Sequence, residues 1–100
     1  MKVQTEAIQF KADAKLLNRI DLKLTKLEKL FDRIIGAHVK LKLENSGQVK
    51  DKVLEIKIDV PGQILVASAV DKSFESALDE VMDSLKRQLL KYKDRLRPRS

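Results

Sequence analysis

Lysine and arginine gather at one end of this chain, where their charge could hold an anionic partner. The last fifteen residues, Lys86 to Ser100, contain seven basic residues and one acid. Their net charge of +6 equals the formal charge of all 100 residues, so residues 1–85 are neutral overall. Because charge concentrated in one segment attracts polyanions, the segment predicts a polyanion-binding surface, with nucleic acid as the best candidate.

A second basic set recurs at helical spacing in the first third of the chain. If residues 14–33 are helical, six cations fall within an arc of roughly 120° opposite the apolar positions. They are Lys15, Arg19, Lys23, Lys26, Lys29 and Arg33. The acids Asp21, Glu28 and Asp32 lie on a separate flank, so they do not neutralise this ridge. The ridge fits an external anion, and it fits an ordinary solvated helix face as well.

Residue types that catalyse reactions or hold metals are scarce. The chain has no cysteine, which excludes a thiolate nucleophile, a disulfide and a thiolate zinc site. Its one histidine, His38, lies at a polar position of an alternating run, and glycine-rich phosphate loops, nucleophile elbows and HExxH motifs are absent. We therefore expect a protein that is not an enzyme and that uses no cofactor, no metal and no small-molecule substrate.

Two amphipathic helices would position the cations. The first is predicted over residues 14–33, where Asp13 caps its start and Gly36 stops it. The second is predicted over residues 74–96, with Ser73 as its cap. Apolar residues recur every three or four positions in both, which predicts one buried stripe per helix. Three of the four aromatic residues lie on these stripes and are expected in the core rather than in a base-stacking platform: Phe31, Phe74 and Tyr92.

Strands fill the rest of the chain. Residues 3–8 form a weakly alternating run, and residues 37–44, 54–60 and 64–70 follow as three further strands. Turn residues separate the last three, at Asn45-Ser46-Gly47 and at Pro61-Gly62. The order β-α-β-β-β-α predicts an α+β two-layer sandwich in which both helices cover one face of a four-stranded sheet. The first strand should lie parallel to the second, an arrangement similar to the double-stranded RNA-binding fold.

One domain accounts for the whole pattern, because 100 residues are too few for two cores. We expect it to span residues 1–96 and to end in a short basic tail, residues 97–100. No apolar stretch approaches 18 residues, so we expect no membrane contact and a cytoplasmic protein.

The second helix divides its charges along its length, with acids first and bases afterwards. Helix-dipole complementation favours this order, yet it explains only the cations of the last turn. The remaining bases again indicate a polyanion partner. The cations of this helix are Lys86, Arg87, Lys91, Lys93 and Arg95.

Two stretches of this helix carry a resemblance to a known family. Residues 71–79 (DKSFESALD) and 85–95 (LKRQLLKYKDR) resemble the last helix of the ribosome hibernation-promoting factors, also called the ribosomal subunit interface or sigma-54 modulation protein family. Residues 23–29 (KLTKLEK) are similar to the family's Lys-Leu and Leu-Glu-Lys pattern. The predicted element order is that of the family, so the resemblance covers the whole chain.

The resemblance implies a non-enzymatic factor that binds the small ribosomal subunit under stress or in stationary phase. Its basic helices would contact 16S ribosomal RNA in the decoding channel and block messenger RNA and tRNA. The matching motifs single out Lys23, Lys26, Lys29, Arg87, Lys91, Lys93 and Arg95, whereas Lys15, Arg19, Arg33 and Lys86 rest on charge geometry alone. The chain resembles the short form of the family, which promotes inactive ribosome dimers.

One position departs from the family pattern, and two other functions stay open. Leu90 stands where relatives often carry a basic residue, which would weaken a phosphate contact. The older family name leaves room for a module that binds an acidic transcription-factor partner. The predicted fold leaves room for a general double-stranded RNA binder.

Overall fold

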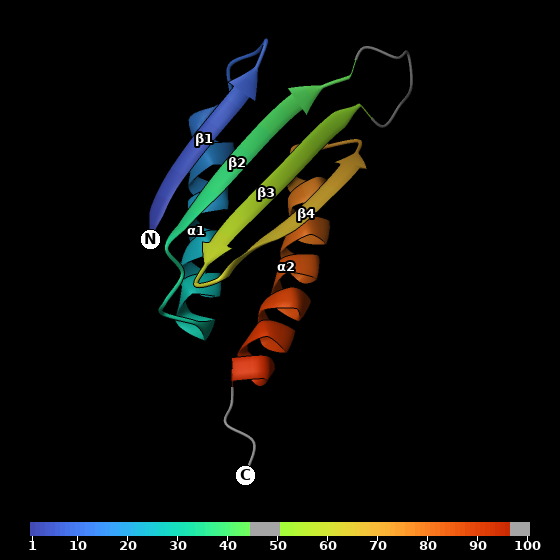
Figure 1. Ribbon diagram of the computed structural model, residues 1–100. Coiled ribbons are helices and arrows are strands. Elements are labelled where there is room, and N and C mark those ends of the chain that lie inside the picture. Colours follow the sequence, from blue (N-terminus) through green and yellow to red (C-terminus); the bar gives the residue numbers. More distant parts are fainter. Residues whose placement is uncertain (45–50, 97–100) are drawn as a thin grey trace.

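The computed structural model describes residues 1–44 and 51–96 of the chain. Its elements follow the predicted order (Figure 1). Their bounds are β1 Lys2–Ile8, α1 Ala14–Leu30, β2 Gly36–Leu43, β3 Lys52–Val60, β4 Gln63–Asp71 and α2 Phe74–Leu96. The predicted turn at residues 45–47 and the predicted tail at residues 97–100 lie outside the described residues.

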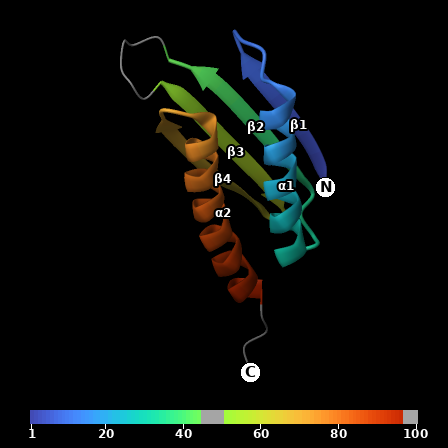
Figure 2. The same ribbon diagram turned by 180° about the vertical axis from the view of Figure 1, so that it is seen from behind.

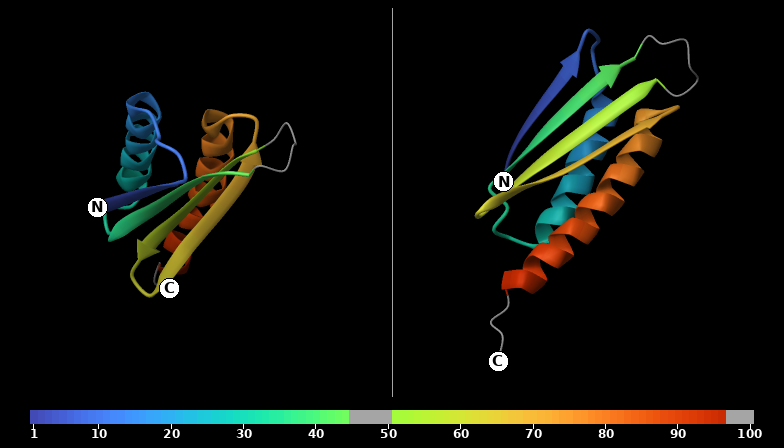
Figure 3. Two further views of the ribbon diagram at one scale, coloured as in Figure 1. Left: turned by 90° about the horizontal axis from the view of Figure 1, so that it is seen from above. Right: turned by 45° about the vertical axis from the view of Figure 1, so that its right-hand side comes forward.

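The strands form one mixed sheet in the order β1-β2-β3-β4. β1 pairs with β2 in parallel, whereas β3 pairs antiparallel with both β2 and β4. A parallel neighbour requires a crossover connection, and α1 provides it on the same face of the sheet that α2 covers (Figures 2 and 3). The predicted two-layer α+β fold is therefore confirmed.

The core lies between this sheet face and the two helices. Alternate residues of the central strands point into it, and Val39, Leu41, Leu54, Ile56 and Ile58 are completely buried. α2 packs on β3 and β4, and α1 lies beside α2. Because each strand alternates, the residues between these positions face water on the outer side of the sheet.

Both predicted helix caps form. A side-chain oxygen of Asp13 accepts a hydrogen bond from the backbone N–H of Leu16 at 2.7 Å. The hydroxyl of Ser73 accepts one from the backbone N–H of Ser76 at 3.1 Å. Each bond satisfies an N–H group of the first turn that has no partner within its helix. Both helices consequently begin where the sequence places them.

Two aromatic pairs hold the β1–α1 and α1–β2 connections against α2. Phe31, Phe74 and Tyr92 are buried, as predicted. Phe31 meets Tyr92 edge to face with 5.4 Å between ring centroids, and Phe10 stacks on Phe74 at 5.3 Å. The hydroxyl of Tyr92 donates a hydrogen bond of 2.6 Å to the carbonyl of Pro61, which ties α2 to the β3–β4 turn.

The end of α1 differs from the prediction. The helix stops at Leu30 rather than Arg33, because Phe31 adopts an extended conformation with φ −156° and ψ 105°. This conformation turns the ring of Phe31 onto Tyr92. The apolar spacing continues past the true helix end because Phe31 and Ile34 stay buried without being helical. Tertiary packing, rather than the apolar periodicity, thus determines where α1 ends.

Gly36 also has another role than the predicted one. It does not stop α1 but opens β2, where it pairs with Lys2 of β1. A Cβ atom on this glycine would lie 2.9 Å from the backbone oxygen of Lys2, closer than such atoms pack. The missing side chain is what allows the start of β1 to reach β2.

Replacing this glycine tests that role. We expect Gly36→Ala to lower the free energy of unfolding by about 1–3 kcal/mol, because the added methyl group overpacks the β1–β2 contact. Urea denaturation measures the total effect, and amide hydrogen exchange locates it. Protection should fall in β1 and persist in β3 and β4. An unchanged midpoint, or a loss spread evenly over all four strands, would contradict this role.

Candidate nucleic-acid interface

The two helices run in the same direction on one face of the sheet, with their C-terminal ends at the same end of the molecule (Figure 2). This arrangement brings the two predicted basic sets onto one side, because the cations of α1 and the C-terminal cations of α2 become neighbours. The sheet lies behind both helices (Figure 3). The sequence predicted each set separately and could not show that they meet.

A groove between α1 and α2 is the place where they meet. Three lysines line it, Lys23 and Lys26 of α1 and Lys86 of α2. Leu27, Leu30 and Met82 also line it, together with the carboxylate of Asp83. Three cations and one acid leave the groove positive. Such a groove suits an anion whose charges are spread along a chain.

One ion pair crosses from α1 to α2. Lys23 Nζ lies 3.7 Å from a carboxylate oxygen of Asp79, and both side chains are at least one third exposed. An exposed pair of this kind contributes little to stability. A phosphate can therefore replace Asp79 as the partner of Lys23 at small cost.

The other cations of α1 project into water. Lys15, Arg19, Lys26 and Lys29 are exposed and make no ion pair with any described residue. Glu28 does not neutralise them, because its carboxylate binds the amino group of Met1 at 2.5 Å. The predicted ridge therefore exists on α1, with an exposed leucine, Leu22, among its cations. The sequence pattern predicted these cations but not this leucine.

The C-terminal half of α2 adds a second free set. Lys86, Arg87, Lys91 and Arg95 are exposed, and none forms an ion pair with a described residue. Leu90 is 46% exposed between them. Like charges without internal partners repel one another, so an external anion would relieve that repulsion.

Two predicted cations are placed differently. Lys93 donates a hydrogen bond of 2.6 Å to the backbone carbonyl of Leu30, at the C-terminal end of α1. Its ammonium group thus caps α1. Arg33 lies beyond the helix, with its guanidinium carbon 5.0 Å from the ring centre of Phe31. Its predicted place on the helical ridge is wrong, because α1 ends three residues earlier.

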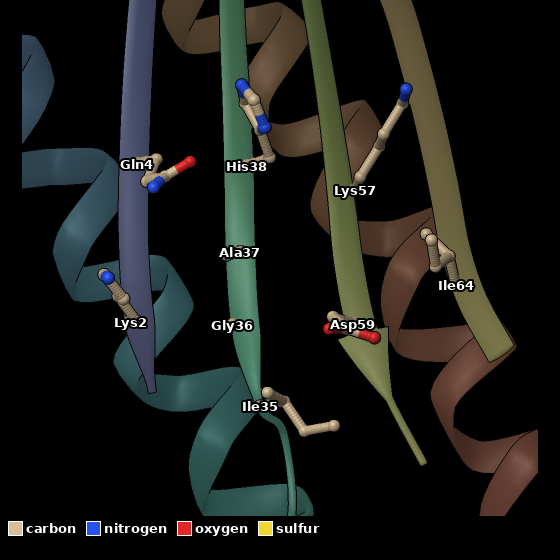
Figure 4. Close-up of a pocket in the computed structure, with 9 residues that line it drawn as sticks. All are labelled: Lys2, Gln4, Ile35, Gly36, Ala37, His38, Lys57, Asp59 and Ile64. Carbon is tan, nitrogen blue, oxygen red and sulfur yellow. The ribbon is translucent and has the colours of Figure 1, made fainter. Parts of the chain in front are cut away.

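The outer face of the sheet is less suited to a polyanion. His38, Lys40 and Lys57 share it with Glu6 and Glu55, and His38 lies 3.9 Å from Glu6 while Lys57 lies 4.0 Å from Glu55. Figure 4 shows a hollow on this face, where side chains of both charge signs and two exposed isoleucines line the surface. The residues that line it are Lys2, Gln4, Ile35, Gly36, Ala37, His38, Lys57, Asp59 and Ile64.

Among residues 1–44 and 51–96, no group of three or more histidine, aspartate or glutamate side chains is arranged to hold a metal ion. Neither of the two described helices combines the length and the apolar character needed to cross a bilayer.

Fold and surface together define an α+β domain with one strongly basic helical side. Residues 3–97 match the Sigma 54 modulation protein / S30EA ribosomal protein family. The chain belongs to this family, as the sequence resemblance predicted.

Curated relatives agree with this assignment. The ribosome hibernation promoting factor of Klebsiella oxytoca is 37% identical over 78 residues, which are 78% of each chain. The factor of the same name from Azotobacter vinelandii is 32% identical over 95 residues, covering 95% of this chain and 85% of that one. These relatives are ribosome hibernation factors, so the family membership supports a hibernation role.

Solved structures show the same fold. A ribosomal subunit interface protein from Coxiella burnetii superposes with a TM-score of 0.84 at 23% identity, covering 94% of this chain and 99% of that one. The N-terminal domain of Protein Y from Thermus thermophilus gives a TM-score of 0.78 at 24% identity, with coverage of 92% and 99%. Both are also α+β domains of this architecture.

The capping role of Lys93 can be separated from a surface role by paired substitutions. We expect Lys93→Met to lower the free energy of unfolding by about 1–2 kcal/mol, because it keeps the aliphatic stem but leaves the carbonyl of Leu30 without its donor. Lys91→Met, at an exposed position two residues away, should change it by less than about 0.5 kcal/mol. Urea unfolding measures both. Equal effects of the two substitutions would refute the cap.

Proposed function

We propose that this protein is a non-enzymatic ribosome hibernation factor that acts in the cytoplasm by binding 16S ribosomal RNA in the small subunit. The helical side occupies the decoding channel and excludes messenger RNA and tRNA, and the complex favours inactive ribosome dimers. The observation that carries the proposal is the convergence of Lys23, Lys26 and Lys86 from two helices on one groove. Family membership supplies the ribosome as the partner.

Phosphate contacts explain how such a surface works without reading a sequence. Lysine and arginine neutralise phosphates and release the counterions bound to them, which is favourable whatever the bases are. The shape of a folded RNA then determines where the surface fits. Here the cations follow two parallel helices on either side of a groove, so they match a folded backbone better than a single straight strand.

Inhibition would follow from occupancy alone. A domain that fills the path of messenger RNA needs no catalytic group, and the described residues supply cations where an enzyme would need paired acids and bases. Exposed Leu22 and Leu90 interrupt the two cationic sets, so the contact includes apolar surface as well as phosphate.

Salt dependence provides the first test. Six to eight phosphate contacts would make log affinity fall with log salt at a slope of about −0.7 to −0.9 per contact, about −4 to −7 in total. Sedimentation of the purified protein with separated subunits through sucrose gradients at increasing salt measures this slope. Co-migration with the small subunit at low salt that disappears at high salt is the expected result. A complex that resists salt would refute phosphate binding.

Charge reversal tests the location of the surface. Arg87→Glu combined with Lys91→Glu should weaken subunit binding by about 100-fold or more, because each reversal places like charges together. Both side chains are exposed, so circular dichroism and the unfolding midpoint should stay unchanged. The matched control, Lys40→Glu with Lys42→Glu, alters the net charge equally on the outer sheet face and should bind almost normally. Equal losses in both variants would place the effect in net charge rather than in the helical side.

The same gradients separate two other candidate functions. Binding to a plain RNA duplex as tight as binding to the subunit would indicate a general double-stranded RNA binder. Capture of an acidic protein that survives nuclease treatment, without subunit binding, would indicate a protein-binding module. A shift of ribosomes into dimers would extend the proposed role beyond occupancy of single particles.

A further inference from the structure

The groove between α1 and α2 contains a group that does not suit phosphate. The carboxylate of Asp83 lines it beside the three lysines, and a carboxylate repels a phosphate that approaches it. Asp83 is exposed and forms no ion pair with any described residue. This carboxylate is therefore available to a part of the bound partner other than its phosphates.

Apolar side chains also line the groove. Leu27, Leu30 and Met82 lie between its charged residues. Leu27 is 3% exposed and belongs to the core, whereas Leu30 and Met82 are only partly buried. A phosphate would lose hydration against such a surface, but the flat face of a nucleobase gains by leaving water there. Enzymes that hold a base outside the stack also place apolar side chains against its face.

The size of the groove sets a limit on what it can hold. Its volume is about 320 Å³, which is at the lower end of the range of about 300–1,000 Å³ for small-molecule sites. The bases of a duplex are covered by their partners and neighbours, whereas an unpaired base can turn out of its strand. The groove therefore suits a single unpaired base.

Positive charge continues from the groove along α1. Lys23 and Lys26 line the groove and also a second hollow on α1, which Lys15 and Arg19 line as well. Eleven helical residues separate Lys15 from Lys26, a rise of about 16 Å. A row of cations of this length suits several consecutive phosphates, so it favours a strand over a free nucleotide.

A base can supply the hydrogen-bond donor that suits Asp83. Adenine, cytosine and guanine each carry an exocyclic amino group, and a carboxylate can accept a hydrogen bond from the N4 amino group of cytosine. Uracil has a carbonyl oxygen at that position, so two acceptors would face each other beside Asp83. The acid in the groove thus distinguishes between bases, although the lysines do not.

From these observations we infer that the groove binds one unpaired base of an RNA strand and prefers a base with an exocyclic amino group over uracil. The base lies against Leu30 and Met82, and its amino group donates a hydrogen bond to Asp83. The three lysines of the groove contact the neighbouring phosphates. This inference rests on the proposed RNA-binding function and adds a base contact to it.

Two oligonucleotides of equal charge test the preference. Oligocytidine and oligouridine of about eight nucleotides have the same phosphates and differ only in their bases. Fluorescence anisotropy with the full chain at low salt measures both dissociation constants. Oligocytidine should bind about fivefold more tightly, because only cytosine donates to the carboxylate. Equal affinity would overturn the inference. Cytidine monophosphate should compete only at millimolar concentration, and displacement at micromolar concentration would contradict the choice of a strand.

A pair of substitutions on α2 locates the preference. Asp83→Ala removes the acceptor, so the ratio of the two dissociation constants should fall to about one. The matched control is Asp79→Ala, which removes the same charge one helical turn away, at a residue that pairs with Lys23 and does not line the groove. Each variant should bind both oligonucleotides more tightly, because each loses a negative charge, but Asp79→Ala should keep the ratio. A ratio that survives Asp83→Ala, or that both variants abolish, would refute the base contact.

The apolar contact is tested by a third variant. Met82→Gln keeps the length of the side chain and makes the groove lining more polar. It should weaken oligocytidine binding by about threefold and leave unchanged the binding of an abasic strand with the same phosphates. Circular dichroism verifies that the variant is folded. Equal losses for the two strands would show that Met82 does not contact a base.

Failure of the base site can be distinguished from failure of the proposed function. Binding to the small subunit and its salt slope are measured separately, in the sucrose gradients. A protein that binds the subunit but shows no preference between the oligonucleotides would overturn the base site alone. A protein that keeps the preference, and loses it in Asp83→Ala, would support the base site even if it did not bind the subunit.

Discussion

The apolar inner face of a single sheet is the constraint on which the rest of the structure depends. Both helices must cover this face, because its central residues, among them Ile56 and Ile58, are completely buried. Burial of one such side chain contributes about 1.5–3 kcal/mol, whereas a like-charge pair on a helix surface costs only about 0.2–0.5 kcal/mol. The hydrophobic requirement therefore outweighs the repulsion between the cations of α1 and the basic C-terminal half of α2. Their combined charge is a consequence of how the core is closed.

Parallel orientation of the helices adds a second electrostatic effect. Both helix dipoles direct their negative ends to the same end of the molecule, where backbone carbonyls lack partners. Lys93 satisfies one of these carbonyls by reaching from α2 to Leu30 of α1. Cations near this end thus serve the fold and the surface together. Charge counting from the sequence cannot divide them between these roles, because the division depends on a contact between residues 63 positions apart.

Local patterns predicted most of the fold because their physical causes are local. Strand alternation, the caps at Asp13 and Ser73 and the apolar stripe of α2 each arise within a few residues, and the structure has them where expected. The end of α1 was mispredicted because Phe31 packs against Tyr92, far away in the sequence. Gly36 was misread for the same reason, since its neighbour is Lys2 of another strand. For the candidate site, the sequence predicted the cations but not the groove that three of them line.

The two faces of the domain differ in a way that determines orientation on a target. Most cations of α1 and of the C-terminal half of α2 form no ion pair with a described residue, whereas acids are interleaved with the cations of the outer sheet face, where Lys57 lies 4.0 Å from Glu55. The positive field of the helical side is therefore less cancelled by neighbouring acids, which favours the approach of a polyanion to that side. Net charge alone could not produce this difference between the two faces, because the difference depends on where the acids lie among the bases.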